Sequence, residues 1–409
     1  MSMRTVLRFF GVAIFAIAIC AHAQTYSVLH TFTGGADGAQ PWAGVTVDSG
    51  GNLYGTATEG AYTGGNCSPN GCGTAYKLKR SGTGWTFSTL YTFHDSDGAF
   101  PYAPLIFGPD GALYGTTNQG GVHPCCGAVF SLRPPATFCS SVVCPWVQNL
   151  LWSFDVAPDG NDPFLGAVTF DAAGHIFGTT TYGGNYYQGT AFELQKQPSG
   201  GWTENILFNF GLGGQQPYNN LIFDSSGNIY TTTEIGGADN AGAVVELVNS
   251  PSGWTENDIY SFTGASDGSY PYAGLIFDQA GNLYGTTRIG GANNDGTVFE
   301  LTPSNGSWTF HVIYDGGGWS GLTMDAAGNL YGTFGSGAYG NGAVSKLTPS
   351  NGSWIYTPLY SFTGGSDGGG PVGGVAFDAN GNLYGTTASG GNLSDCQGYG
   401  CGVVWELTP

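Results

Sequence analysis

A sevenfold internal repeat constrains the fold of this chain more than any other feature of its sequence. The phrase "AGNLYGTTRIGG" at 280–291 returns as "NGNLYGTTASGG" at 380–391, and weaker copies occur along the chain. Aligned on its aromatic residue, the copies fall at Tyr54, Tyr114, Phe177, Tyr230, Tyr284, Tyr331 and Tyr384. A spacing of 47 to 63 residues, with strand-like segments and no helical period, is typical of β-propeller blades.

Each copy predicts four β-strands. The first is a short apolar run such as "GLIFD" at 274–278, the second is "NLYGTT", and the third is "GTVFEL" at 296–301 or a relative of it. The fourth runs from a Trp to a Phe eight residues later, as from Trp254 to Phe262. β-Branched and aromatic residues suit all four strands. Between the first two strands, Asp278 and the "GN" after it predict a tight turn, so we interpret this recurring Asp as structural.

The two ends of the chain complement each other within this pattern. The C-terminus stops at "GVVWELTP", the third strand of copy seven, whereas "QTYSVLHTF" at 24–32 resembles a fourth strand with no blade before it. The simplest arrangement is a closed ring in which the N-terminal strand completes the last blade, because closure protects strand edges. We therefore predict an all-β fold: one seven-bladed β-propeller of four-stranded blades over residues 24–409, with no second domain.

Residues 1–23 have the pattern of a signal peptide. A basic start, an apolar run and the small-x-small site "AHA" predict cleavage after Ala23. The apolar run is too short to span a bilayer, so we expect no membrane span. The protein is therefore predicted to be secreted or otherwise extracytoplasmic.

The cysteines fit an exported protein. Eight of the nine follow residue 23, an even number that favours disulfides outside the cytoplasm. Three pairs share one spacing, and we expect local bridges, above all in the matching loops of the first and last: Cys67/Cys72, Cys139/Cys144 and Cys396/Cys401. Cys125 and Cys126 are adjacent, which leaves open either a vicinal bridge or crossed pairing with Cys139 and Cys144.

The charge of the mature chain restricts its partners. Nine Lys and Arg oppose 28 Asp and Glu, and two of the basic residues, Arg4 and Arg8, lie in the signal peptide, so the mature charge is −21. Phosphate binding needs Lys and Arg, so this charge argues against nucleic acid or an anionic membrane as a partner. We expect a monomer whose partner is a polysaccharide or another cell-surface component.

In combination, "NLYGTT", a Gly-Gly loop and "GTVFEL" resemble the tandem repeat of the Gloeobacter/Verrucomicrobia type (GloVer), over essentially the whole mature chain. The resemblance implies an exported bacterial repeat protein, often with a variable C-terminal surface anchor. Because this chain ends at Pro409, inside the predicted ring, we expect that anchor to be absent. The resemblance implies no particular activity.

We expect ligand binding on the face where the loops from strand four to strand one meet the loops from strand two to strand three. An aromatic series lies on this face. The series lies six residues before the position of the recurring turn Asp and consists of Trp42, Tyr102, Tyr218, Tyr272 and Trp319. The loop from strand two to strand three adds Tyr186 and Tyr187. Leu165 and Val372 break the series, although Phe164 is adjacent to Leu165. Aromatic rings with polar edges suit sugar faces, and packing between blades is the alternative interpretation.

Acidic residues recur near the same face, in Asp-Gly pairs at Asp37, Asp97, Asp267 and Asp367, with Asp162 close by. Ringed carboxylates and carbonyls are calcium ligands, but Asp-Gly is also ordinary turn chemistry and no EF-hand spacing is present. We therefore expect no cofactor, with Ca²⁺ as the alternative.

Candidate catalytic residues occur singly rather than in every copy. Glu59, Glu234 and Arg288 hold neighbouring positions in the loops after strand two, and His123 lies in the corresponding loop of copy two. Such groups supply acid, base and anion-binding chemistry, but no established catalytic or nucleotide motif accompanies them. We therefore favour a binding or surface-interaction protein for polysaccharide over an enzyme. The alternatives are a polysaccharide lyase or glycosidase on the same face, and a purely structural envelope protein.

Overall fold

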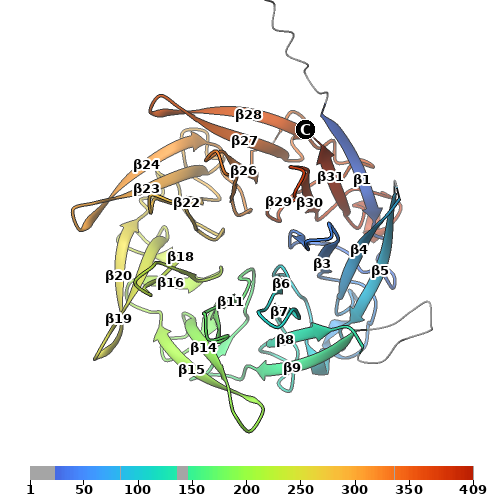
Figure 1. The fold of residues 1–409 in the computed structure, drawn as a ribbon, viewed down its shortest axis with the longest axis horizontal. Helices are drawn as coiled ribbons and strands as arrows, with labels where there is room; N and C mark the ends of the chain where they lie inside the picture. The colour runs from blue at the N-terminus through green and yellow to red at the C-terminus, as the bar shows by residue number, and fades with distance from the viewer. Residues whose placement is uncertain (1–23, 83, 136–145, 336, 409) are drawn as a thin grey trace, which may run out of the picture.

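The computed structural model describes residues 24–82, 84–135, 146–335 and 337–408, which form seven small antiparallel sheets arranged in a ring (Figure 1). A cavity lined by residues of all seven blades lies at the centre of the ring, and we call it the central channel. The predicted seven-bladed β-propeller is confirmed. The predicted signal peptide, residues 1–23, and the Cys139/Cys144 pair lie outside the described residues. Within the described part of the chain, no helix has the length and apolar character needed to cross a membrane.

Each blade runs from a short inner strand to a long outer strand. We number the blades 1 to 7 along the chain, so that blade 1 contains β2 to β5 and blade 7 contains β29, β30, β31 and β1. The inner strands are β2 (Thr46–Val47), β6 (Ile106–Phe107), β11 (Thr169–Phe170), β17 (Ile222–Phe223), β21 (Ile276–Phe277), β25 (Thr323–Met324) and β29 (Ala376–Phe377). The second strands are β3 (Leu53–Ala57), β7 (Leu113–Thr117), β12 (Ile176–Thr180), β18 (Ile229–Gly236), β22 (Leu283–Thr286), β26 (Leu330–Thr333) and β30 (Leu383–Thr387).

The two outer strands of each blade are longer. The third strands are β4 (Thr74–Ser81), β8 (Ala128–Arg133), β14 (Thr190–Lys196), β19 (Ala243–Ser250), β23 (Thr297–Ser304), β27 (Ala343–Ser350) and β31 (Val403–Thr408). The fourth strands are β5 (Gly84–Thr92), β9 (Val147–Ser153), β15 (Trp202–Asn209), β20 (Gly253–Ser261), β24 (Ser307–Asp315), β28 (Ser353–Ser361) and β1 (Thr25–Thr31). Three 3-10 turns lie in loops: η1 (Gly65–Cys67), η2 (Asp95–Asp97) and η3 (Cys396–Gly398).

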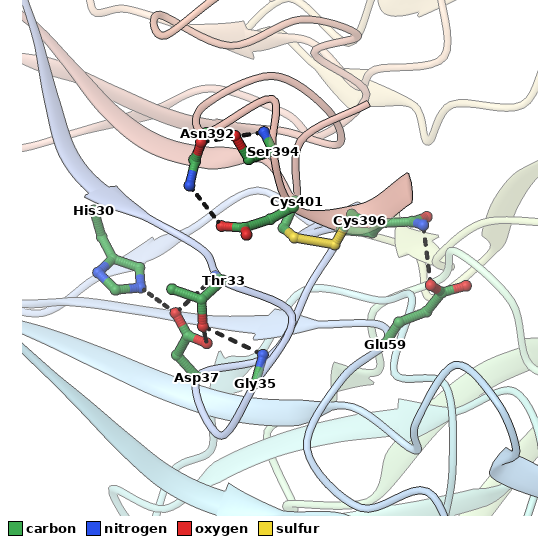
Figure 2. Close-up of a disulfide and its surroundings, with 11 residues drawn as sticks. His30, Thr33, Gly35, Asp37, Glu59, Asn392, Ser394, Cys396 and Cys401 are labelled. Carbon is green, nitrogen blue, oxygen red and sulfur yellow. Dashed lines mark hydrogen bonds and ion pairs between the residues drawn. A yellow bond between two sulfur atoms is a disulfide. The ribbon is translucent and has the colours of Figure 1, made fainter. Parts of the chain in front are cut away.

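The N-terminal strand closes the ring as predicted. β1 pairs antiparallel with β31, from Thr25 opposite Thr408 to Thr31 opposite Val403, and the blue β1 lies beside the red β31 in Figure 1. The Cys396–Cys401 disulfide lies close to the loop after β1 (Figure 2). A Cβ atom at Gly34 would come within 3.1 Å of the Cys396 sulfur, so the two ends of the chain are packed tightly in blade 7.

The repeated phrase builds the core of each blade. Leu283 and Tyr284 of β22 are buried between neighbouring sheets. The glycine that follows them leaves room for an aromatic ring, since a Cβ atom at Gly285 would lie 2.5 Å from Phe299 Cζ. Before the phrase, Asp278 accepts hydrogen bonds at 2.8 Å from the backbone N–H and the side-chain Nδ2 of Asn282. The recurring Asp of this turn is therefore structural, as predicted.

In six of the seven blades, a Thr of the phrase joins the blade to the next one. Thr286 Oγ1 donates to the Ser320 carbonyl at 3.1 Å, and Thr386 Oγ1 donates to the Ala43 carbonyl at 2.7 Å across the closure of the ring. Equivalent bonds are made by Thr56, Thr179, Thr232 and Thr333. Each accepting carbonyl directly follows the residue that the next blade places at the channel mouth, so these bonds fix the backbone of the candidate site.

Candidate functional site

The two kinds of loop predicted to share a face do meet, and we call this face the channel face. Backbone bridges join them in four blades: Ala39–Glu59, Ala99–Gln119, Ser269–Ile289 and Gly369–Ser389. In blade 3, β10 (Gly160–Asn161) pairs with β13 (Tyr182–Gly183), and in blade 4, β16 (Gly214–Pro217) pairs with β18. These extra pairings tie the variable loops to the rigid sheets.

A left-handed residue followed by proline directs the chain to the channel mouth in five blades. These residues, with φ between 53° and 57°, are Gln40, Phe100, Asp162, Gln216 and Tyr270. The conformation costs a non-glycine residue on the order of 1–3 kcal/mol. A hydrogen bond to the preceding blade offsets this cost, as from the Gln40 N–H to the Cys401 carbonyl at 2.8 Å. The residue after the proline is therefore held in an equivalent place in each of these blades.

Six aromatic side chains form a closed circle at the channel mouth, which we call the aromatic ring. Its members are Trp42, Tyr102, Phe164, Tyr218, Tyr272 and Trp319, with neighbouring centroids 4.5–6.1 Å apart. Most contacts are edge-to-face or tilted, which is the favoured arrangement of aromatic pairs. Tyr272 is buried, and the other five are partly exposed. The predicted series is thus brought together, and its rings pack on one another while retaining exposed surface.

Sequence reasoning left Phe164 outside the series because counting back from Asp171 reaches Leu165. Counting from the proline would have found it, since Phe164 follows Pro163 as Tyr272 follows Pro271. Blade 3 has one residue more between the proline and the turn. Val372 follows Pro371 but supplies no aromatic ring, and Trp42 and Trp319 approach each other to 6.1 Å between their centroids. A cavity of about 270 Å³ at the ring is lined in part by Trp42, Trp319, Leu165 and Val372.

Glu234 and Arg288 converge on one member of the aromatic ring. The Tyr272 hydroxyl donates to the Glu234 carboxylate, and Arg288 Nη1 lies 3.4 Å from the same hydroxyl oxygen. The Arg288 guanidinium stacks over Trp319, 4.0 Å from the ring centroid. Burial and the Glu234 carboxylate raise the pKa of Tyr272 to about 12, so the phenol remains a donor at neutral pH.

Glu59 lies on the channel face with Trp42 instead. Its carboxylate accepts from Gln40 Nε2 at 3.0 Å and Asn70 Nδ2 at 3.1 Å, while Gln40 Oε1 accepts from the Trp42 indole at 3.2 Å. Burial raises the pKa of Glu59. His123, in the blade-2 loop, has its Nε2 atom 3.6 Å from the Asp155 carboxylate. The predicted catalytic candidates are therefore distributed over loops of the channel face, and of these four only Glu234 and Arg288 lie in one cluster.

Asp162 is a functional candidate that the sequence marks only weakly. It stands two residues before Phe164, and burial raises the pKa of its carboxyl group to about 6. Among the described residues, no group hydrogen-bonds to its buried Oδ1 atom. The only sequence signal was its place near an Asp-Gly pair at this face.

A groove opens beside the aromatic ring at blade 6, and we call it the blade-6 groove. The connection from β24 to β25 covers only 316–322, whereas that from β20 to β21 covers 262–275. Among the described residues, the short connection forms no backbone pairing with the neighbouring loop, whereas each of the other six blades has such a pairing. The groove has a volume of about 480 Å³ and is lined by Arg288, Asp295 and Trp319, among others. Its sequence signal is the short spacing of 47 residues between copies five and six.

The four aspartates considered for calcium each stabilise a loop of their own. Asp37 accepts from the Thr33 N–H and from His30 (Figure 2), and Asp97 from the His94 N–H. Asp267 accepts from the Thr263 N–H and from the Tyr260 hydroxyl, and Asp367 does the same with Thr363 and Tyr360. These contacts are those of turn chemistry.

A different group in blade 3, on the face opposite the aromatic ring, has the composition of a metal site. His175 Nδ1 lies 2.9 Å from the Asp171 carboxylate and 3.1 Å from that of Glu193. In blade 5 the equivalent donors are Asn282 Nδ2 and the Tyr284 hydroxyl. His175 therefore supplies, from one nitrogen, the contacts that two side chains make elsewhere.

In the described part of the chain, three disulfides lie in loops after strand two, on the channel face. Cys67–Cys72 and Cys396–Cys401 are confirmed, and Cys125 and Cys126 are bonded to each other. The loop before β14 carries Tyr186 and Tyr187, which are 54% and 69% exposed. Among the described residues, neither tyrosine makes an aromatic contact with a member of the aromatic ring.

Several solved structures are similar to this one at low sequence identity. A 6-phosphogluconolactonase candidate from Bacteroides uniformis is 16% identical over 84% of this chain and 88% of that one, with a TM-score of 0.48. A protein from Lactobacillus plantarum is 15% identical over 88% and 99%, with a TM-score of 0.49. An ancestral GH74 enzyme is 13% identical over 90% and 50%, with a TM-score of 0.49.

At the level of sequence, no curated protein matches this chain. The model of the Gloeobacter/Verrucomicrobia repeat, in contrast, matches residues 11–144, 147–323 and 250–409. These overlapping matches span nearly all seven blades and include the phrase that builds them. The chain therefore belongs to the Gloeobacter/Verrucomicrobia repeat family.

Proposed function

We propose that this protein is a secreted, monomeric binding protein that holds a polysaccharide across the aromatic ring. The observation that carries the proposal is the closed circle of six aromatic side chains, five of them partly exposed, at the channel mouth. Aromatic surfaces pack against the apolar faces of sugars, while polar groups at their edges fix orientation. Three disulfides and the signal-like N-terminus support export, because disulfides persist in oxidising compartments.

The aromatic ring is held in place before any ligand arrives. Left-handed residues such as Gln40, and hydrogen bonds such as that of Thr386 to the Ala43 carbonyl, fix the backbone on either side of Trp42. A preorganised site loses little conformational entropy on binding. The cavity of about 270 Å³ at the ring is small, so we infer that a glycan chain lies across the mouth rather than inside the channel.

Calorimetric titration of residues 24–409 with a panel of neutral and acidic polysaccharides, with and without calcium, tests this proposal. Trp42→Ala and Trp319→Ala should each weaken binding about tenfold or more, since central aromatic residues dominate such sites. Trp354→Ala is the matched control, because Trp354 packs against Tyr284 near the outer rim. Equal affinities for Trp42→Ala and Trp354→Ala would remove the aromatic ring from the proposal. Calcium dependence would direct attention back to the Asp-Gly loops.

A polysaccharide lyase or glycosidase is a second candidate function. It is favoured by Asp162, whose raised pKa of about 6 and unpaired Oδ1 atom suit a proton donor beside the aromatic ring. Release of reducing ends or unsaturated products from the polysaccharides that bind, followed between pH 4 and 8, tests it. We expect Asp162→Asn to abolish turnover while leaving affinity in place. Binding without product formation at any pH in this range would exclude the enzyme.

A further inference from the structure

We propose that the blade-6 groove is the subsite for a carboxylate-bearing sugar unit, which Arg288 holds by its guanidinium group. This inference rests on the proposed glycan binding at the aromatic ring and adds a chemical specificity to it. The observations that carry it are the groove at blade 6, the contacts of Arg288, and the negative charge around both.

The groove exists because blade 6 lacks the long connection that the other blades place there. In blade 5, residues 262–275 fold over the channel face and pair Ser269 with Ile289, whereas residues 316–322 of blade 6 are too short to do so. The space left open, about 480 Å³, is lined at once by Arg288 and by Trp319. Because Trp319 also belongs to the aromatic ring, a sugar chain lying on that ring can extend one unit into the groove.

Among the described residues, Arg288 is the one Lys or Arg placed on the channel face. The other six of the mature chain lie in third strands and are Lys77, Lys79, Arg80, Arg133, Lys196 and Lys346. Arg80 pairs with Glu406, and Arg133 pairs with Asp110. In the described parts of the chain, no carboxylate oxygen lies within 4.0 Å of the Arg288 guanidinium nitrogens, and its side chain is exposed.

The contacts of Arg288 orient it while leaving its charge available. Trp319 covers one face of the guanidinium at 4.0 Å, and Tyr272 lies 5.3 Å away. Stacking of this kind uses the face of the group, whereas the N–H donors project from its edge and match a carboxylate in two parallel hydrogen bonds. Glu234, which shares the Tyr272 hydroxyl with Arg288, already accepts from that hydroxyl. Arg288 is thus positioned to accept a carboxylate from a ligand.

The charge of the whole protein limits how acidic that ligand can be. A mature charge of −21 repels a dense polyanion, and Asp295 lines the same groove, so a second ligand acid nearby would be disfavoured. The chemistry therefore fits a mainly neutral glycan with widely spaced uronic acid units. One carboxylate would bind Arg288 while the neutral backbone lies on the aromatic ring.

Calorimetric titration of residues 24–409 with glucuronoxylan, gum arabic and xanthan, each beside its carboxyl-reduced form, tests the inference. The reduced forms keep the backbone and remove only the charge. We expect at least one acidic form to bind about tenfold more tightly than its reduced form, which corresponds to about 1.4 kcal/mol. Arg288→Gln should abolish this difference without changing affinity for the reduced form, and Arg288→Lys should restore part of it. Arg133→Gln, on the opposite face, should change neither affinity.

The remaining outcomes separate the inference from the proposed function. Equal binding of acidic and reduced forms by the wild-type protein would overturn the carboxylate subsite and leave the aromatic ring as a neutral glycan site. An equal loss for both forms in Arg288→Gln would make Arg288 a support for Trp319 rather than a carboxylate ligand, and would also overturn the subsite. No binding to any form by the wild-type protein would remove both proposals.

Discussion

Two boundaries between blades differ in how their equivalent residues pair. The residues between blades 4 and 5 find partners across the boundary, whereas, as far as the chain is described, polar groups at the same positions between blades 2 and 3 do not. Between blades 4 and 5, Thr232 donates to the Ala273 carbonyl at 3.1 Å, and Tyr260 stacks on Phe310 with centroids 3.9 Å apart. Between blades 2 and 3, the equivalent Thr116 hydroxyl is buried with no hydrogen-bond partner among the described residues.

The outer edge of the boundary between blades 2 and 3 differs in the same way. Glu204 takes the place of Phe310 and lies beside Asp159, and the equivalent of Tyr260 is Trp152, whose buried indole N–H has no partner within the described residues. Buried polar groups without partners cost stability. Asp162 and Phe164 of the channel face belong to the same boundary. Regular positions of the repeat hold one boundary together, whereas departures from the repeat gather at the other boundary, from its outer edge to the channel face.

The largest expected difference between the two boundaries is in their response to pH. Burial, and then the neighbouring Asp159, raise the pKa of Glu204 far above its ordinary value. The folded protein therefore retains a proton that the unfolded chain loses near pH 4–5, so stability falls as pH rises through and above this range. We expect wild type to lose about 1–3 kcal/mol of unfolding free energy between pH 5 and 8, and Glu204→Gln to lose clearly less.

Chemical denaturation at the two pH values measures this effect. Phe310→Leu is the control from the other boundary, because the side chain replaced does not titrate and should shift stability equally at both pH values. The same pH dependence in wild type and Glu204→Gln would show that the Glu204–Asp159 contact does not control it.

A smaller difference is expected from the paired threonines. Thr232→Val should cost about 1–2 kcal/mol of unfolding free energy, because it leaves the buried Ala273 carbonyl without its donor. Thr116→Val removes a hydroxyl that has no partner in the described structure, so it should be neutral or slightly stabilising. Urea denaturation of both variants measures this contrast, and equal destabilisation by the two substitutions would contradict the assignment of Thr116 as unpaired.

The smallest expected effect concerns the turn of blade 3. The double substitution His175→Asn and Phe177→Tyr restores the residues that blade 5 has at these positions, so we expect a change within about 1 kcal/mol, towards greater stability. Thermal unfolding with and without Zn²⁺ gives a second measure. The turn interpretation predicts no effect of Zn²⁺ on the wild-type protein, whereas a stabilisation that the double variant lacks would assign the Asp171, His175 and Glu193 group to a metal.

The sequence predicted the fold in detail because the repeat carries its own physical reasons. Gly285 has to be glycine beneath Phe299, the Asp278 turn fixes where strand two begins, and the unpaired strands at both ends require closure. The inner strands are shorter than predicted, since only Ile276 and Phe277 pair with β22 in place of the predicted strand over 274–278.

The candidate site was only partly predictable. The aromatic series could be found by counting, but the extra residue in blade 3 concealed Phe164. The pairing of Glu234 with Tyr272 joins residues 38 positions apart, which no spacing rule indicates. The short connection at blade 6 is visible in the sequence as a short repeat. The groove that it leaves beside Arg288 depends on where the neighbouring loops lie in three dimensions, which the repeat length does not indicate.

Hydrogen–deuterium exchange of residues 24–409, with and without a saturating polysaccharide, would locate the bound glycan on the propeller. If the glycan lies across the aromatic ring, protection should concentrate in the segments around Trp42, Tyr102 and Trp319, together with the loop that carries Arg288. Protection confined to the opposite face, in the turns around Asp278 and Asp325, would contradict the account and place the binding site elsewhere on the propeller.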